Sequence, residues 1–358
     1  MFLTNEEIDQ KIKLFIKNHP SVNLKHIQKL TNDTGILQHA KFNIPNYHHG
    51  YCLDDNCRAL LLIARIHPIR DPEVNDKLIA TYLAYIFYMQ REDGNFINFM
   101  AYDLQFLEAK GSDDSFGRTI WALGELIANK EWSTYRPIAL EIFNKGIRQI
   151  PNLISLRAKG YALLGILAVL TQFPARSDLV EWIKSLQESI HEEFMIASHG
   201  RWTWYESILS YDNAILPLAL VKASQYLNDK PGVASAIKSF HFLDQLTFSG
   251  AYFQPVGNEY WYTEGGSFSL YGQQPIEIPM MMLLYQEMIG IGPDKSLLGK
   301  LQKTFLWFLG LNSKGLALFD EQSKGCCDGL EDYGVNQNQG AESSLSFWLA
   351  YQILRSVK

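Results

Sequence analysis

The sequence predicts an all-α protein: a single domain in which about twelve helices form an (α/α)6 toroid. Apolar residues recur with a period of 3.6 residues along most of the chain, and alternating strand patterns are few. Long polar loops fall between every second pair of these helical segments. The chain has 358 residues without a low-complexity linker, which suits six helical hairpins closed into one ring.

Most of the predicted helices are about 14–19 residues long, and Pro, Gly or Asn marks many of their boundaries. They cover residues 5–18, 54–67, 75–90, 114–129, 134–148, 156–172, 177–195, 212–226, 231–246, 274–289, 295–310 and 340–356. The longer loops are 32–53, 91–112, 196–210, 247–273 and 311–339. An open solenoid of the same hairpins is the alternative, but it would bury its ends less well and should show a more even repeat.

Composition excludes several classes of protein. The hydrophobic fraction of 47% supplies a large core, and the net charge of −6 without a Lys/Arg run argues against a nucleic-acid surface. No stretch of about 18 uncharged apolar residues occurs, so we expect no membrane partner. The acidic, amphipathic start lacks the features of a secretory signal, and we expect a cytoplasmic protein.

The cysteines give no reason to expect a metal. Cys52, Cys57, Cys326 and Cys327 match no common zinc spacing, and free thiols are expected in a reducing compartment. The motifs of P-loop enzymes, serine hydrolases and zinc peptidases are absent from the sequence. We therefore expect neither a metal nor a cofactor.

The candidate functional residues lie at the starts of the predicted helices. In alternating antiparallel hairpins every second helix begins at the same end of the ring, so the long loops should converge on one face. The junctions fall at Asp54, Asp113, Asp212, Gln274 and Asn338, with Ser155 a weaker sixth. The loops also bring Trp and Tyr next to these acids. The sequence therefore predicts a funnel lined by carboxylates and aromatic rings, which is a typical composition for a sugar site.

Helix capping is the simpler explanation for each acid taken alone. Asp at a helix start is a preferred N-cap and contributes about 1 kcal/mol. Glu277 fits a capping box, and Arg58 and Arg118 fit ion pairs with a carboxylate one turn earlier. Capping needs only one Asp, however, and two junctions carry an adjacent pair. Because neighbouring carboxylates repel, one pKa of such a pair tends to rise, as it does in general acids.

Five segments resemble bacterial proteins of the six-hairpin glycosidase superfamily, whose members are often encoded with, or fused to, glycosyltransferases. These segments are GYCLDDNCRAL, GSDDSFGRTIWALGE, SYDNAILPLAL, QQPIEIPMMM and CCDGLEDYGVNQNQGAES. The resemblance extends from about Thr34 to the end of the chain. It implies an (α/α)6 fold and action on, or binding of, glycans. Cys57 stands where related sequences favour Ala, which argues against a metal role for it.

The leading functional hypothesis is a glycoside hydrolase acting on an oligosaccharide or other glycan with a pair of carboxylates. The candidate catalytic residues are Asp55, Asp114, Asp212, Glu277 and Glu342. We favour Glu342 or Glu277 for one role and Asp114 or Asp212 for the other. The predicted substrate-binding residues are His49, Tyr51, Asp54, Arg58, Asp113, Arg118, Trp202, Trp204, Tyr211, Asn213, Trp261, Gln273, Gln274, Asp328, Asn336, Asn338 and Gln339.

Two other hypotheses stay open at the level of sequence. One is a sugar 2-epimerase or isomerase, a chemistry that usually employs His as acid and base. The later half of the chain holds only His191, His199 and His241, which lie in or beside predicted outer helices. The other is a non-catalytic glycan-binding module, since a toroid can keep its funnel without its chemistry. The glycan, its linkage and the oligomeric state are not specified by the sequence.

Overall fold

The computed structural model describes residues 4–67, 71–248, 251–292, 294 and 296–357, which form thirteen α-helices. Six of them make an inner ring: α3 (Leu53–Arg65), α5 (Asp113–Ala128), α7 (Leu156–Gln172), α9 (Ile215–Leu227), α11 (Glu277–Ile291) and α13 (Ala341–Ser356). The outer ring consists of α1 (Asn5–Asn18), α4 (Pro72–Met89), α6 (Arg136–Gly146), α8 (Ser177–Ala197), α10 (Lys230–Thr247) and α12 (Ser296–Leu306). A further short helix, α2, covers Lys25–Leu30.

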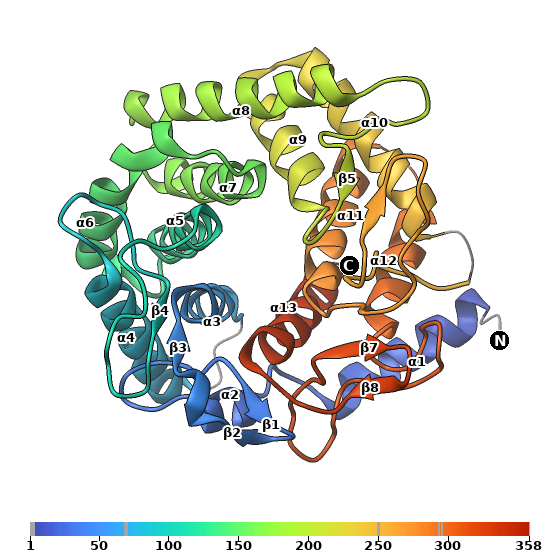
Figure 1. Ribbon diagram of the computed structural model, residues 1–358, viewed down its shortest axis with the longest axis horizontal. Helices are drawn as coiled ribbons and strands as arrows, with labels where there is room; N and C mark the ends of the chain where they lie inside the picture. Colours follow the sequence, from blue (N-terminus) through green and yellow to red (C-terminus); the bar gives the residue numbers. More distant parts are fainter. Residues whose placement is uncertain (1–3, 68–70, 249–250, 293, 295, 358) are drawn as a thin grey trace.

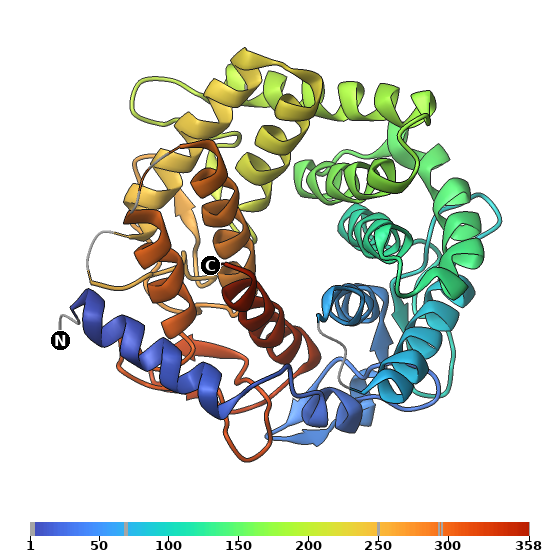
Figure 2. The ribbon, with the colours of Figure 1, turned by 180° about the vertical axis from the view of Figure 1, so that it is seen from behind.

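The inner ring is closed. Each inner helix contacts the next one along the chain, and α13 contacts α3 (Figure 1). The chain therefore forms an (α/α)6 toroid, and the open solenoid is excluded. Figure 2, from the opposite side, shows α1 in the outer ring beside α12, so the two ends of the chain complete the last hairpin.

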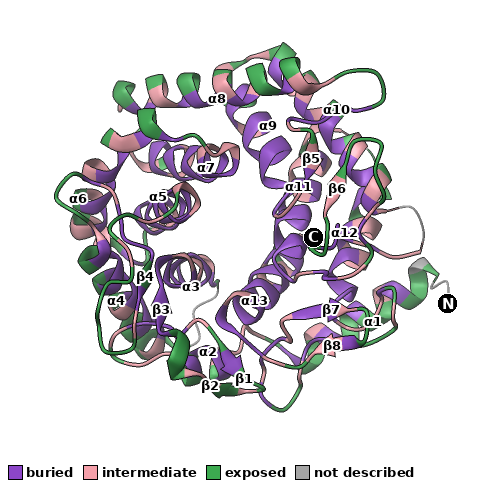
Figure 3. Ribbon diagram, in the orientation of Figure 1, coloured by how far each residue is buried: buried purple, intermediate pink, exposed green. Residues whose placement is uncertain are grey.

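Burial follows the two rings. The inner helices are buried nearly all round, whereas the outer helices expose one face to solvent (Figure 3). This difference explains their composition, because a helix enclosed on every side must be apolar on every side. Within the described part of the chain no helix has the length and apolar character needed to cross a membrane.

Two glycines bring α5 and α7 unusually close. A Cβ on Gly124 would lie 2.2 Å from the carbonyl oxygen of Gly165, and a Cβ on Gly165 would lie 2.2 Å from the carbonyl oxygen of Ile120. Neither position tolerates a side chain without displacing backbone. The close approach aligns the polar residues at the starts of these two helices.

The loops pair into short strands at the face where the inner helices begin. Their bounds are β1 (Ala40–Lys41) with β2 (Ile44–Pro45), β3 (Tyr51–Cys52) with β4 (Phe99–Met100), β5 (Ile208–Leu209) with β6 (Tyr262–Thr263), and β7 (Gly329–Glu331) with β8 (Gly334–Asn336). All four pairs are antiparallel. The β3–β4 and β5–β6 pairs join loops that are far apart in sequence, which fixes the loops relative to one another.

The structure corrects several predicted boundaries. Helix α2 was not predicted, because six residues are too few to show a helical period. Helix α9 begins at Ile215 rather than Asp212, and α11 begins at Glu277 rather than Gln274. The N-caps of α3 and α5 are Cys52 and Ser112, so Asp54 and Asp113 lie within the first turn instead of capping it. The four cysteines are free, as expected.

Candidate functional site

A cavity of about 870 Å³ lies at the end of the toroid where the inner helices begin. Each of the six inner helices contributes to it, from its first turn or from the loop before it. The lining residues are Asp54, Arg58, Asn98, Phe99, Glu108, Ser112, Asp113, Asp114, Arg118, Ile154, Ser155, Tyr211, Asn258, Trp261, Gln274, Ile276 and Glu342. Four of the six predicted junctions lie in this lining, namely Asp54, Asp113, Ser155 and Gln274.

A much smaller pocket of about 30 Å³ continues from the floor of this cavity toward the axis of the ring. Arg58, Arg118 and Ile276 line both spaces. Asp212 and Trp121 line the small pocket but not the larger cavity. Its volume is about that of one or two water molecules.

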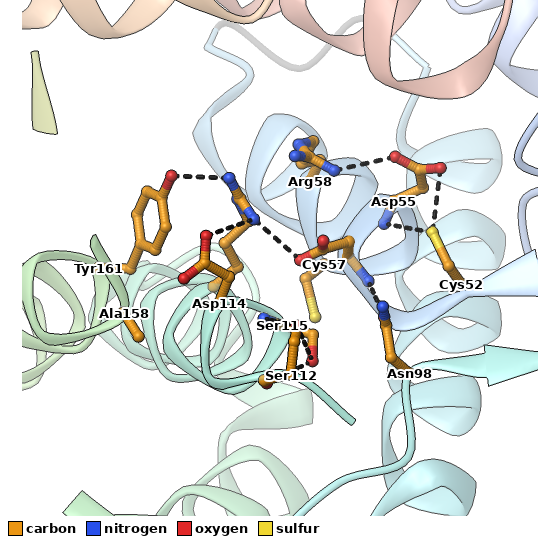
Figure 4. Close-up of polar contacts among 12 residues, drawn as sticks. Cys52, Asp55, Cys57, Arg58, Asn98, Ser112, Asp114, Ser115, Ala158 and Tyr161 are labelled. Atoms are coloured by element: carbon orange, nitrogen blue, oxygen red, sulfur yellow. Dashed lines mark hydrogen bonds and ion pairs between the residues drawn. The ribbon is translucent and has the colours of Figure 1, made fainter. Parts of the chain in front are cut away.

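Arg118 joins three carboxylates on the floor of the cavity. Its Nη1 lies 3.1 Å from Oδ1 of Asp54 and 3.9 Å from Oδ2 of Asp114, and its Nη2 lies 3.6 Å from Oδ2 of Asp212. The same Nη2 donates a 2.7 Å hydrogen bond to the hydroxyl of Tyr161 (Figure 4). Burial opposes ionisation of Asp54, but the charges of Arg118 and Arg58 outweigh it and hold the pKa of Asp54 below its ordinary value.

Asp212 is the most deeply buried of these acids, with 2% of its surface exposed. Tyr161 donates a hydrogen bond to its Oδ2, while its Oδ1 has no hydrogen-bond partner. Burial raises the pKa of Asp212 above its ordinary value despite the nearby charge of Arg118. Asp212 thus lines the small pocket and has one buried carboxyl oxygen without a hydrogen-bond partner.

The φ angle of Asp212 is +46°, in the left-handed region, and Glu277 maintains this turn. The Glu277 carboxyl accepts hydrogen bonds from the backbone N–H groups of Asp212 and Asn213. Burial and the charge of Asp212 raise the pKa of Glu277 to about 8. Glu277 is the first residue of α11 and lines neither space, so the predicted capping-box position was wrong; its carboxyl positions Asp212.

Asp113 and Asp114, the adjacent pair of α5, face different partners. Oδ2 of Asp113 accepts hydrogen bonds of 2.7 and 3.1 Å from the backbone N–H groups of Ile154 and Ser155. Asp114 accepts hydrogen bonds of 2.6 Å from the hydroxyls of Ser155 and Tyr211. Asp113 therefore anchors the loop that precedes α7, whereas hydroxyl donors surround Asp114 at the cavity wall.

The adjacent pair of α3 also divides its roles. Asp54 lines the cavity, but Asp55 is buried behind it, 3.0 Å from Nη1 of Arg58 (Figure 4). Nη2 of Arg58 lies 2.7 Å from Oε2 of Glu342, a residue of α13 that lines the cavity. Burial raises the pKa of Asp55 to about 7, in spite of Arg58 and with a contribution from Glu342.

The aromatic wall of the cavity comes from Phe99, Tyr211 and Trp261. The Tyr211 and Trp261 rings lie with their centroids 6.3 Å apart at an angle of 50°. Trp261 has a φ angle of +59°, which is unusual for a bulky residue and signals that the surrounding loop holds it in place. These rings supply apolar faces next to the carboxylates.

Sequence reasoning missed two residues of α7. Tyr161 connects Arg118 with Asp212, and Arg157 lies one turn before it. Arg157 donates hydrogen bonds to the backbone carbonyl of Tyr211 at 2.6 Å and to Glu206 at 2.8 Å, and it lies against the Tyr211 ring. An Arg and a Tyr four residues apart in a mostly apolar helix are the signal in the sequence that could have pointed to them.

Other predicted site residues lie outside the cavity lining. They are His49, Tyr51, Trp202, Trp204, Asn213, Gln273, Asp328, Asn336, Asn338 and Gln339. Most of them bond within the fold: Gln273 accepts from Trp307, and Asp328 accepts from the backbone of Gly340. Trp204 is fully buried in the core. These side chains hold the loops that carry the cavity, which is why they cluster with the lining residues in sequence.

All nine histidines lie in the part of the chain that the structure describes, and none of them lines the cavity or the small pocket. His191 and His241 are on the outer helices α8 and α10. His199 pairs with Glu264 at the surface. The ionisable groups that line the two spaces are therefore carboxylates, arginines, Tyr211 and the Cys57 thiol.

Comparison with solved structures establishes the architecture. The cellobiose 2-epimerase of Bacillus thermoamylovorans B4167 superposes with a TM-score of 0.73 at 10% identity, over 96% of this chain and 99% of that one. This chain has the six-hairpin (α/α)6 fold. A D-mannose isomerase superposes with a TM-score of 0.69 at 12% identity, over 96% of this toroid and 98% of the isomerase.

A third six-hairpin structure is the α-1,6-mannanase of Salegentibacter sp. HEL1_6, with a TM-score of 0.60 at 13% identity over 99% of this chain and 100% of that one. It is an inactive variant with two successive aspartates replaced by alanine, in complex with α-1,6-mannotetrose. No protein-family model and no curated protein sequence matches this chain. Since identities are 9–14%, these likenesses show the fold.

Proposed function

We propose that this protein binds an oligosaccharide in the cavity and hydrolyses a glycosidic bond with carboxylates at its floor. The observation that carries the proposal is the cavity itself: about 870 Å³ lined by five carboxylates and three aromatic rings. Sugar rings present apolar faces that stack on aromatic side chains, and their hydroxyls donate to carboxylates. The volume lies within the range of ordinary ligand sites.

Asp114 is the proposed base or nucleophile. Two hydroxyl donors and the guanidinium of Arg118 surround its carboxylate and hold it in place at the cavity wall. An ionised carboxylate is what activation of water, or direct attack on the sugar, requires.

Asp212 is the proposed general acid. Burial raises its pKa, which is the direction that a general acid needs, and its Oδ1 has no hydrogen-bond partner. The same guanidinium lies 3.9 Å from Asp114 and 3.6 Å from Asp212, so the two carboxyls are within roughly 10 Å of each other. Both stereochemical courses of glycoside hydrolysis use carboxyl separations below about 10 Å.

The adjacent carboxylates of α5 give a second line of support. In the α-1,6-mannanase with the same fold, replacing two successive aspartates accompanies inactivity. Asp113 and Asp114 are successive, and both reach the cavity. We infer that Asp113 anchors the loop before α7 and that Asp114 is the reactive carboxylate.

The test is an assay of purified protein with cello-, malto- and α-1,6-manno-oligosaccharides in ¹⁸O-labelled water. The wild-type protein should release labelled reducing sugar, and Asp114→Asn and Asp212→Asn should each lower the rate by at least about 100-fold. Glu181→Gln, an exposed carboxylate on α8, is the matched control and should keep full activity. Full activity in both Asn variants would contradict the assignment.

The second candidate is a sugar 2-epimerase or isomerase. The observation that favours it is the closer superposition, with TM-scores of 0.69–0.73 against 0.59–0.60 for the hydrolases. A carboxylate would then have to remove the proton next to the carbonyl, since the cavity is lined without histidine.

Isotopes separate the candidates. Turnover of cellobiose or mannose in D₂O would place deuterium on carbon only in the epimerase reaction, whereas ¹⁸O from water enters the product of hydrolysis. Binding of these oligosaccharides without either label would indicate a glycan-binding module instead.

A further inference from the structure

The rim of the cavity continues into a stack of tyrosines. Phe99, on β4, lines the cavity, and Tyr102 follows three residues later. Strand β4 pairs with β3, which places Tyr51 opposite Met100. Two loops that are distant in sequence thus bring their aromatic residues together just outside the cavity.

The stack consists of Tyr51, Tyr102 and Tyr47. The Tyr51 and Tyr102 rings are nearly parallel, at 13° with centroids 6.2 Å apart, and the Tyr102 and Tyr47 rings lie at 12° with centroids 4.5 Å apart. Exposure increases along the stack, from 1% for Tyr51 to 45% for Tyr102 and 55% for Tyr47. A hydrogen bond of 2.7 Å from Asn32 to the Tyr51 hydroxyl secures the buried end.

The three rings of the stack have fixed orientations although two of them are exposed. The outer two rings are exposed but oriented by the buried third, so little rotamer entropy remains to be lost when a ligand stacks on them. Leaving two large rings half exposed forgoes the stabilisation that burial would give. A flat, oriented and exposed aromatic face is suited to a ligand with an apolar face and a polar edge.

We propose that this tyrosine stack binds the distal residues of an oligosaccharide whose reacting end occupies the cavity. A sugar chain is favoured over a second protein as the occupant because the stack is continuous with the cavity. Phe99 of β4 lines the cavity, and Tyr102 lies in the turn that directly follows β4. Sugars bound on the stack and in the cavity are then parts of one chain. The inference rests on the proposed glycan-binding function of the cavity.

It also specifies the substrate class. The protein prefers a chain long enough to extend over the rim beside α3, and affinity rises with chain length until the stack is occupied. A mono- or disaccharide fills the cavity alone and gains nothing from the stack.

The experiment measures affinity by calorimetry for cello-, malto- and α-1,6-manno-oligosaccharides of two to six residues, with the wild-type protein, Tyr47→Ala and Tyr102→Ala. The control is Tyr226→Ala, which removes a ring of 43% exposure at the opposite mouth of the toroid. Both stack variants should lose about tenfold in affinity for the longest bound chain and keep the wild-type affinity for the disaccharide. Tyr226→Ala should match the wild type throughout.

The outcomes separate the two inferences. If an oligosaccharide binds but the stack variants retain the wild-type dependence on chain length, the tyrosine stack is not a glycan site while the cavity remains one. If no oligosaccharide of any length binds, the proposed function and this inference both fail. A concentration-dependent dimer that Tyr47→Ala abolishes, with unchanged dependence on chain length, would overturn the inference in favour of a contact between copies of the chain.

Discussion

The hydroxyl of Tyr161 accepts a 2.7 Å hydrogen bond from Arg118 and donates one to Asp212. This relationship links α5, α7 and the loop before α9 at the floor of the cavity. Helices α5 and α7 pack closely at Gly124 and Gly165, and this close packing brings Arg118 within reach of Tyr161.

Replacing Tyr161 by Phe should therefore weaken both the fold and the site. The change removes one buried hydrogen bond from Arg118 and one from Asp212, which should lower the free energy of unfolding by about 1–3 kcal/mol. It should also lower the catalytic rate at least about tenfold, because Asp212 loses the contact that orients it. Denaturant unfolding and the oligosaccharide assay measure the two effects.

Tyr205→Phe is the control for this variant. Tyr205 is equally buried, and its hydroxyl makes a 2.8 Å hydrogen bond with Ser239, away from the cavity. The control should lose stability but keep its rate. Equal rates in the two variants would show that Tyr161 has a structural role only.

Arg157→Lys should loosen the loop that carries Tyr211. A lysine keeps the charge but cannot hold the carbonyl of Tyr211 and the carboxylate of Glu206 at once. Calorimetry should show at least about fivefold weaker oligosaccharide binding. Arg65→Lys, whose guanidinium pairs with Glu125 at the opposite mouth, should bind normally; a loss of equal size there would indicate general destabilisation.

Stability should fall as the pH rises through the titration of Glu277. The folded pKa is about 8 and the ordinary value is 4.5, so between these values the folded state binds more protons than the unfolded state. Its contribution is fully present below pH 4.5 and is lost as the pH rises to about 8. Asp55 adds a similar decline between its ordinary pKa of 3.8 and about 7.

Chemical denaturation at a series of pH values checks this prediction. Glu277→Gln should flatten the decline between pH 5 and pH 8, while Glu181→Gln on the surface should leave the wild-type slope. A wild-type slope in Glu277→Gln would contradict the assignment of the buried proton to this carboxyl.

Gly124→Ala should be among the more damaging small substitutions. The added Cβ meets the backbone of Gly165 and forces α5 and α7 apart, which should lower the free energy of unfolding by about 1–3 kcal/mol. Gly299→Ala on α12 is the matched control: its Cβ would meet nothing within 4 Å, so gained helix propensity should leave stability unchanged or raised. Thermal unfolding of the two variants tests the contrast, and a stable Gly124→Ala protein would refute the close packing.

The helix junctions show which residues of the cavity could be predicted from the sequence. Asp54, Asp113 and Asp114 were identifiable because acids cluster at helix starts, and the hairpin pattern brings those starts to one face. Trp204 and Gln273 had the same local signals, yet they are buried in the fold. Sequence adjacency to an acid does not distinguish a ring that faces the cavity from a ring that holds the loop beneath it.

Tyr161 and Arg157 illustrate the opposite error. Neither has an acidic pair beside it, although Arg157 follows the junction at Ser155, and a Tyr in an apolar helix is ordinarily part of a core. Their roles depend on contacts with residues more than forty positions away, such as Asp212 and Glu206. Glu277 likewise fits a helix cap by its sequence, but its partners are backbone N–H groups of the loop before α9.

The sequence by itself determined the helices, the hairpin pairing and the end of the ring at which the acids gather, because periodicity and turn chemistry are local properties. Only the tertiary structure decided which carboxyl is buried, which oxygen lacks a partner and which rings remain exposed. Those properties arise from desolvation and from contacts between side chains far apart in sequence, such as those of Arg118 with Asp54 and Asp212, which exist only in the folded ring.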